Sequence, residues 1–144
     1  MWKTLAGHCI YQTSTGTKVV QNPLFRWLEF NNSNALQTVL NRYRPEKPGL
    51  HYIKPLILAA ELQPGSTCML GLGGAGAAHA LSPFLRSSQL TVIESNAEVI
   101  DLAARFFKVG NIANLTIIHQ DANLYLQECR SQFQHLLVDL FDPV

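Results

Sequence analysis

The sequence is poor in charged residues. Asp, Glu, Lys and Arg make up 15% of its 144 residues, whereas an average soluble domain has roughly 25%. We therefore expect much of the chain to be buried, either within one domain or against a partner. The net charge is only +1, so the charge pattern argues against nucleic acid or an anionic membrane surface as a partner.

Cysteines and histidines are few and scattered. The three cysteines and five histidines form no C-x-x-C or H-x-x-x-H spacing, so we expect no metal site. The cysteine count is odd and MWKTLAGHCIY has no apolar signal-peptide core, which together favour a reducing, cytoplasmic location. The apolar stretch PLILAA is far too short to span a bilayer.

The first 48 residues are expected to form a small β region with a helix. Strands are predicted at HCIYQT, TKVVQ and FRWLEF, the first two separated by the turn-forming STGT. The stretch NNSNALQTVLNRY is predicted to be helical, with Asn32 or Ser33 as its N-cap. RPEKPG then breaks the pattern, and we place a domain boundary between residues 48 and 49.

Residues 49–144 predict an α/β fold. HYIKPLILAAEL is expected to be a helix, because Pro55 is tolerated in a first turn. Four apolar strands then alternate with three helices, and Ser95 with Glu98 predicts a capping box for the helix AEVIDLAARFF. This order indicates a Rossmann-like parallel sheet of about four strands with right-handed crossovers. The strands are TCMLGL, LTVIES, LTIIHQ and HLLVDLF.

Candidate binding residues follow the first two of these strands. Ligands of open parallel sheets bind at the carboxyl ends of the strands. Gly71 to Gly76 form G-x-G-x-x-G, which lets backbone approach a ligand beside a helix N-terminus; the alternative is a tight strand-to-helix turn with close packing. Glu94 lies at the distance of about twenty residues where an acid accepts both ribose hydroxyls; the alternative is a carboxylate favoured by the helix dipole.

Acidic residues also follow the third and fourth strands. Asp121, with Ala122, could accept a hydrogen bond from an adenine amino group, or Asp121 could cap the next helix. Asp139 ends an apolar run, where burial would raise its pKa and suit a general base; alternatively, Asp139 and Asp142 are ordinary loop acids. A dinucleotide fold explains only the glycines and Glu94. A fold that binds an adenosyl sulfonium explains all four positions.

The segment from about His51 to Val144 resembles the spermidine synthase family, a branch of the class I S-adenosylmethionine-dependent methyltransferase fold. The motifs that carry the resemblance are CMLGLGGAG, LTVIESNAEVIDLAARFF, LTIIHQDANLYL and HLLVDLFDP. The N-terminal strands also resemble the family's small β-hairpin domain. The resemblance implies an α/β, Rossmann-like sheet of the methyltransferase type with a small N-terminal β region.

The resemblance also implies roles for individual residues. The donor would be S-adenosylmethionine or its decarboxylated form, the acceptor a small amine, and no metal would be required. Asp139 would deprotonate the attacking amine, and Asp142 would help to hold the cationic acceptor. Gln37 and Tyr52 lie roughly where the family carries substrate-binding residues. The implied donor-binding residues are Gly71, Gly73, Gly74, Gly76, Glu94, Asp121 and Ala122.

Three positions depart from the family pattern. Gly74 stands where the family usually has an aspartate that grips the aminopropyl group, Asn96 replaces a second acid, and no glutamate follows His51-Tyr52. Nucleotide binding is therefore better supported than polyamine synthesis. The leading hypothesis is a spermidine synthase-like transferase that moves an aminopropyl group to an amine. The alternatives are a methyltransferase, which Gly74 favours, a non-catalytic nucleotide-binding or dimerising relic, and an NAD-binding module.

The sequence stops just after the fourth strand, at Asp142-Pro143-Val144. The family normally adds three more strands, and an uncovered fourth strand would be a template for aggregation. We therefore expect either that the chain is a fragment or that another chain covers this edge. A natural four-stranded protein would be a homodimer.

Overall fold

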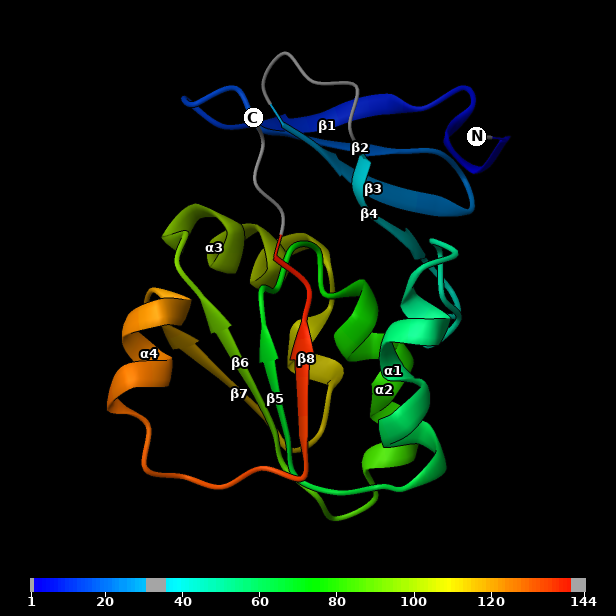
Figure 1. The fold of residues 1–144 in the computed structure, drawn as a ribbon. Coiled ribbons are helices and arrows are strands. Elements are labelled where there is room, and N and C mark those ends of the chain that lie inside the picture. Colours follow the sequence, from blue (N-terminus) through cyan, green and yellow to red (C-terminus); the bar gives the residue numbers. More distant parts are fainter. Residues whose placement is uncertain (1, 31–35, 141–144) are drawn as a thin grey trace.

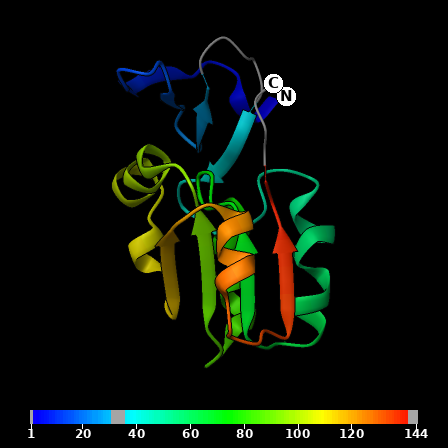
Figure 2. The ribbon, with the colours of Figure 1, turned by 60° about the vertical axis from the view of Figure 1, so that its left-hand side comes forward.

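The computed structural model describes residues 2–30 and 36–140, which form two sheets (Figure 1). The N-terminal sheet is antiparallel and has the order β1-β2-β3-β4. It lies over the carboxyl ends of the parallel strands, as Figures 1 and 2 both show. After a short 3-10 helix at Trp2–Thr4, its strands are β1 His8–Gln12, β2 Lys18–Gln21, β3 Phe25–Glu29 and β4 Leu36–Asn41.

The prediction of a helix over residues 31–43 is wrong. Residues 36–41 form β4, which pairs antiparallel with β3. Val39 and Leu40 are both buried, on opposite faces of the strand, where they join two different apolar clusters. A strand covered on both faces loses the alternating pattern that identifies a strand from sequence. The proposed caps Asn32 and Ser33 lie outside the described residues.

The parallel sheet confirms the predicted Rossmann-like fold. Its strand order is β7-β6-β5-β8, and all neighbouring strands are parallel. The first of the parallel strands in the chain, β5, therefore lies inside the sheet, with β6 on one side of it and β8 on the other. The strands are β5 Thr67–Leu70, β6 Leu90–Glu94, β7 Leu115–His119 and β8 His135–Val138.

Helices cover the two faces of this sheet unequally. Met69, Val92 and Leu137 pack in one cluster with residues of three helices, α1, α2 and α3. On the other face, Cys68 and Leu70 pack in a cluster with residues of α4 and the loop after it. None of the helices in the described ranges is long and apolar enough to cross a membrane. The helices are α1 Ile53–Leu62, α2 Gly76–Leu85, α3 Ala97–Phe106 and α4 Ala122–Glu128.

The predicted capping box at the start of α3 is wrong in its details. Asn96, rather than Ser95, is the N-cap, and its side chain accepts a hydrogen bond from the Glu98 N–H. The Glu98 carboxylate instead accepts hydrogen bonds from the hydroxyls of Thr13 and Thr15, beside the turn after β1. Glu98 therefore joins α3 to the N-terminal sheet. The division of the chain at residue 48 stays a prediction.

Candidate functional site

A cavity of about 600 Å³ lies between the N-terminal sheet and the carboxyl ends of β5, β6 and β8. This volume is within the usual range for small-molecule sites. The described chain brings residues from β4, the segment before α1 and three parallel strands to its wall. The lining residues are Phe30, Leu36, Gln37, Thr38, Tyr52, Gly71, Leu72, Gly73, Glu94, Ser95, Asn96, Val99, Asp139 and Leu140.

The predicted glycine loop divides into two parts. Gly71 and Gly73 line the cavity and have φ values of 94° and 51°. A Cβ on Gly71 would lie 2.3 Å from the carbonyl oxygen of Asp139, so only glycine allows the ends of β5 and β8 to meet here. Gly74 and Gly76 do not line the cavity, and a Cβ on Gly74 would lie 2.7 Å from Thr38 Cγ2. Close packing, the alternative reading of the motif, explains these two positions.

Glu94 joins the glycine loop to the start of α3. Its Oε2 accepts a hydrogen bond of 2.9 Å from the Leu72 N–H, and its Oε1 accepts one of 2.9 Å from the Asn96 N–H. The carboxylate is thus held in place at the end of β6, on the cavity wall. A carboxylate has about four acceptor positions, so Glu94 can still accept hydrogen bonds from ligand hydroxyls.

Asp139 and Tyr52 form a pair on the cavity wall. The Tyr52 hydroxyl donates a 3.4 Å hydrogen bond to Asp139 Oδ2. Burial raises the pKa of Asp139, and the hydrogen bond from Tyr52 lowers it in part. Burial and the charge of Asp139 raise the pKa of Tyr52, so this phenol remains a donor. A carboxylate with a raised pKa is a better proton acceptor near neutral pH.

Gln37 and Thr38 bring β4 into the site. Gln37 Nε2 is buried and has no hydrogen-bond partner among the described atoms, which is a costly state for an amide group unless a ligand completes it. The Thr38 hydroxyl accepts a 2.8 Å hydrogen bond from the Gly74 N–H. Sequence reasoning missed Thr38, because this segment was predicted to be a helix and no motif marks the residue.

The remaining predicted site residues lie elsewhere. Asp121 is the N-cap of α4, and its Oδ1 accepts hydrogen bonds from the N–H groups of Asn123 and Leu124. Ala122 packs beside Cys68 and Leu70. Neither Asp121 nor Ala122 lines the cavity, and Asp142 lies outside the described residues. Over the described ranges, no group of three or more His, Cys, Asp or Glu could hold a metal ion.

Comparisons of the sequence give no relative. No model of a protein family matches the chain, and no curated protein matches it either.

Solved structures match the fold over most of the chain. A spermidine synthase in complex with the transition-state analogue AdoDATO has a TM-score of 0.71 and 18% identity, over 94% of this chain and 47% of that chain. The spermidine synthase of Thermotoga maritima has a TM-score of 0.69 and 16% identity, over 91% of this chain and 47% of that chain. A Podospora anserina methyltransferase bound to SAH has a TM-score of 0.54 and 18% identity, over 66% of this chain and 42% of that chain.

This chain therefore spans about half the length of the spermidine synthases that it resembles. At these identities the likeness shows the fold alone. The fold of the chain is that of a Rossmann-like, methyltransferase-type sheet preceded by a small antiparallel sheet, similar to the fold of the spermidine synthases.

Proposed function

We propose that the cavity binds an adenosyl sulfonium donor and that the protein transfers an aminopropyl group from it to an amine. The observation that carries the proposal is the placement of Glu94 and the Asp139–Tyr52 pair around one cavity. The Glu94 carboxylate is suited to bind ribose hydroxyls, and the Asp139–Tyr52 pair is suited to accept a proton. Their separate positions match the two tasks of such a transferase, which are to hold the donor and to deprotonate the acceptor.

The cavity residues fit such a donor. Gly71 and Gly73 expose backbone without side chains, Glu94 offers hydroxyl acceptors, and Gln37 offers a buried N–H donor that has no described partner. An acceptor atom on the ligand would satisfy Gln37 Nε2 and remove the cost of leaving it unpaired. Asp121 and Ala122 do not line the cavity, so its geometry gives no support for their role in holding adenine. That role stays a prediction.

In this reaction the acceptor amine is the nucleophile, so the protein has to supply a base and accurate positioning rather than a nucleophile of its own. When bound, the donor supplies an electrophilic carbon next to a positively charged sulfur. Asp139 would accept a proton from the acceptor ammonium, and Tyr52 would hold the carboxylate in position. The neutral amine nitrogen would then form the new N–C bond while the C–S⁺ bond breaks and the neutral adenosyl thioether leaves. Asp142 would help to hold a cationic acceptor, as the resemblance implies.

Methyl transfer is the second candidate, because of Gly74. The Thr38 side chain occupies the space where a Gly74 side chain would start: the added Cβ would lie 2.7 Å from Thr38 Cγ2 and 2.8 Å from Thr38 Cβ. The carboxylate that grips an aminopropyl group in the spermidine synthase family therefore has no room at this position. That favours S-adenosylmethionine over its decarboxylated form.

The test is calorimetric titration with decarboxylated S-adenosylmethionine, S-adenosylmethionine, methylthioadenosine and NAD. We expect an adenosyl sulfonium or thioether to bind, and Glu94→Ala to weaken binding by roughly tenfold or more, since hydrogen bonds to charged groups are worth about 1.5–3 kcal/mol. Preference for the decarboxylated donor supports aminopropyl transfer, and preference for S-adenosylmethionine supports methyl transfer.

The control is Glu128→Ala, which removes an exposed acid at the end of α4, outside the cavity. Binding to this variant should equal that of the unaltered chain. Because Glu94 also holds the glycine loop, circular dichroism should show that Glu94→Ala is folded, and Glu94→Gln provides a milder variant. If no adenosyl ligand binds, or NAD alone binds, the proposal is wrong.

A further inference from the structure

A second, smaller pocket lies on the N-terminal sheet, where β3 and β4 meet the end of α3. Its volume is about 180 Å³. Three of the described residues that line it are cations, and none of those described is an acid. The lining residues are Arg26, Leu40, Arg42, Tyr43, Phe106 and Lys108.

Neutral oxygen atoms hold the three cations in place. Arg26 donates hydrogen bonds to the Phe106 carbonyl and, through Nε and Nη2, to Gln21 Oε1. Arg42 Nη1 donates to the carbonyls of Asn22 and Pro23, at 3.0 and 3.1 Å. Lys108 Nζ donates to the Arg42 carbonyl. The side chains are therefore positioned by these contacts, but their charges are not neutralised by them.

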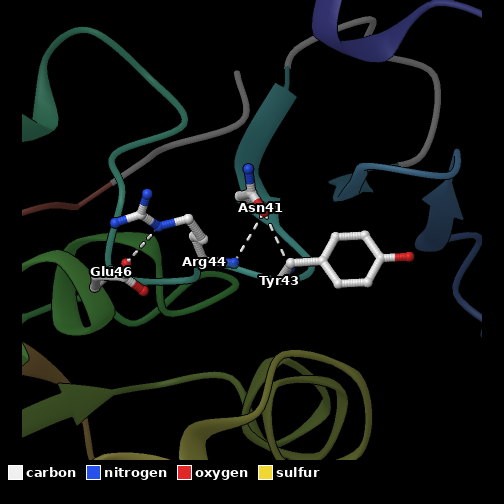
Figure 3. A network of polar contacts seen from close by, with 4 residues as sticks. All are labelled: Asn41, Tyr43, Arg44 and Glu46. Carbon is white, nitrogen blue, oxygen red and sulfur yellow. Dashed lines mark hydrogen bonds and ion pairs between the residues drawn. The ribbon is translucent and has the colours of Figure 1, made fainter.

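Neither ion pair in the described part of the chain includes these cations. One joins Arg44 to Glu46, and the other joins Arg105 to Asp101. Figure 3 shows Glu46 facing Arg44, while the Tyr43 ring, which lines the pocket, points to the opposite side. The acid nearest in sequence to Arg42 is thus already paired with another arginine.

This arrangement carries an electrostatic cost. Like charges repel most strongly where water is partly excluded. Burial and the nearby Arg42 lower the pKa of Arg26, although a guanidinium stays protonated in proteins. A bound anion would remove the repulsion and would use donors that are already in place, so little ordering cost would be added on binding.

We propose that this pocket binds a single oxyanion of the phosphate type, either inorganic phosphate or the phosphate group of a phosphomonoester. Arginine provides planar, paired donors that match phosphate oxygens, and lysine adds a point charge. The volume is below the roughly 300 Å³ at which small-molecule sites begin, so the pocket accommodates one charged group rather than a whole nucleotide. Tyr43 is 70% exposed and offers a ring on which the rest of a phosphomonoester can pack.

The experiment is an NMR titration that follows backbone amides and arginine Nε–H groups as inorganic phosphate or phenyl phosphate, a phosphomonoester without adenosine, is added, with sodium chloride at matched ionic strength as the reference. We expect saturable shifts at Arg26, Arg42 and Lys108. Arg42→Gln and Lys108→Gln should each raise the dissociation constant roughly tenfold. The two variants are independent, so the test survives if one of them fails to fold.

The matched control is Arg130→Gln, which removes one positive charge from the loop after α4, away from the pocket. This variant should bind inorganic phosphate as the unaltered chain does, because Arg130 does not line the pocket. Equal affinities for the two ligands indicate recognition of the free oxyanion, and tighter binding of phenyl phosphate indicates a phosphomonoester. Shifts that chloride reproduces, or that Arg130→Gln weakens equally, overturn the proposal.

Discussion

Asp139 follows β8 directly, and its N–H donates a 2.8 Å hydrogen bond to the Leu70 carbonyl. This contact fixes the residue against the glycine loop, where burial raises the pKa of its carboxyl group. Because the folded pKa exceeds the unfolded value of about 3.9, the folded state binds this proton more tightly. The free energy of unfolding therefore falls as the pH rises from below the unfolded pKa through the folded pKa, and it stays lower at neutral pH.

We expect Asp139→Asn to raise the melting temperature at pH 7, because asparagine has no charge to bury and can still accept the hydrogen bond from Tyr52. The difference from the unaltered chain should shrink as the pH is lowered through the raised pKa of Asp139, because its carboxyl group then becomes protonated. Thermal melting at several pH values measures this. The same variant should lose transfer activity, since it cannot accept a proton.

Asp101→Asn is the control for this prediction. Asp101 is an exposed acid on α3 that pairs with Arg105, so its charge is not buried by folding. Asp101→Asn should give no rise in melting temperature at pH 7. If both variants raise it equally, the effect comes from net charge and the argument from the burial of Asp139 is wrong.

At the scale of elements, Thr38 connects β4 to the glycine loop. Thr38 is buried and accepts the Gly74 N–H. Thr38→Val keeps the side-chain shape but leaves that buried N–H without a partner, so it should lower the free energy of unfolding by about 1–3 kcal/mol. Urea denaturation measures the change. Thr116→Val, on the exposed side of β7, should stay within about 0.5 kcal/mol, and an equally small effect of Thr38→Val would contradict the role given to its hydroxyl.

Sequence reasoning predicted the elements whose signals are local. The four parallel strands are apolar runs, and the helices between them begin at turn or capping residues. Glu94 and Asp139 were therefore correctly placed at strand ends. β4 was missed because it is covered on both faces and so lacks the alternating pattern of a strand, and because its conformation depends on pairing with β3. Thr38 was missed for the same reason. The capping box at Ser95 failed because Glu98 bonds to Thr13 and Thr15, whose proximity only the tertiary structure reveals.

At the scale of the molecule, one part of the parallel sheet is not covered by any of the residues that the structure describes. The sheet pairs Cys68 with Leu136 and Leu70 with Val138. Cys68 and Leu70 are buried, whereas Leu136 and Val138 are 52% and 56% exposed. Within the described chain, β8 also has no strand on its outer edge. Exposed apolar side chains on an unpaired edge strand favour pairing with another chain.

We therefore predict that the 144-residue chain associates through β8, and that a homodimer is the main species. Sedimentation velocity over a range of concentrations should give a mass near twice 16.0 kDa. Val138→Lys places a charge on the exposed strand and should shift the distribution to the monomer. Leu5→Lys changes another exposed apolar residue, 66% exposed at the N-terminal end, and should leave the dimer intact. A monomer at all concentrations, or equal loss of the dimer in both variants, would contradict association through β8.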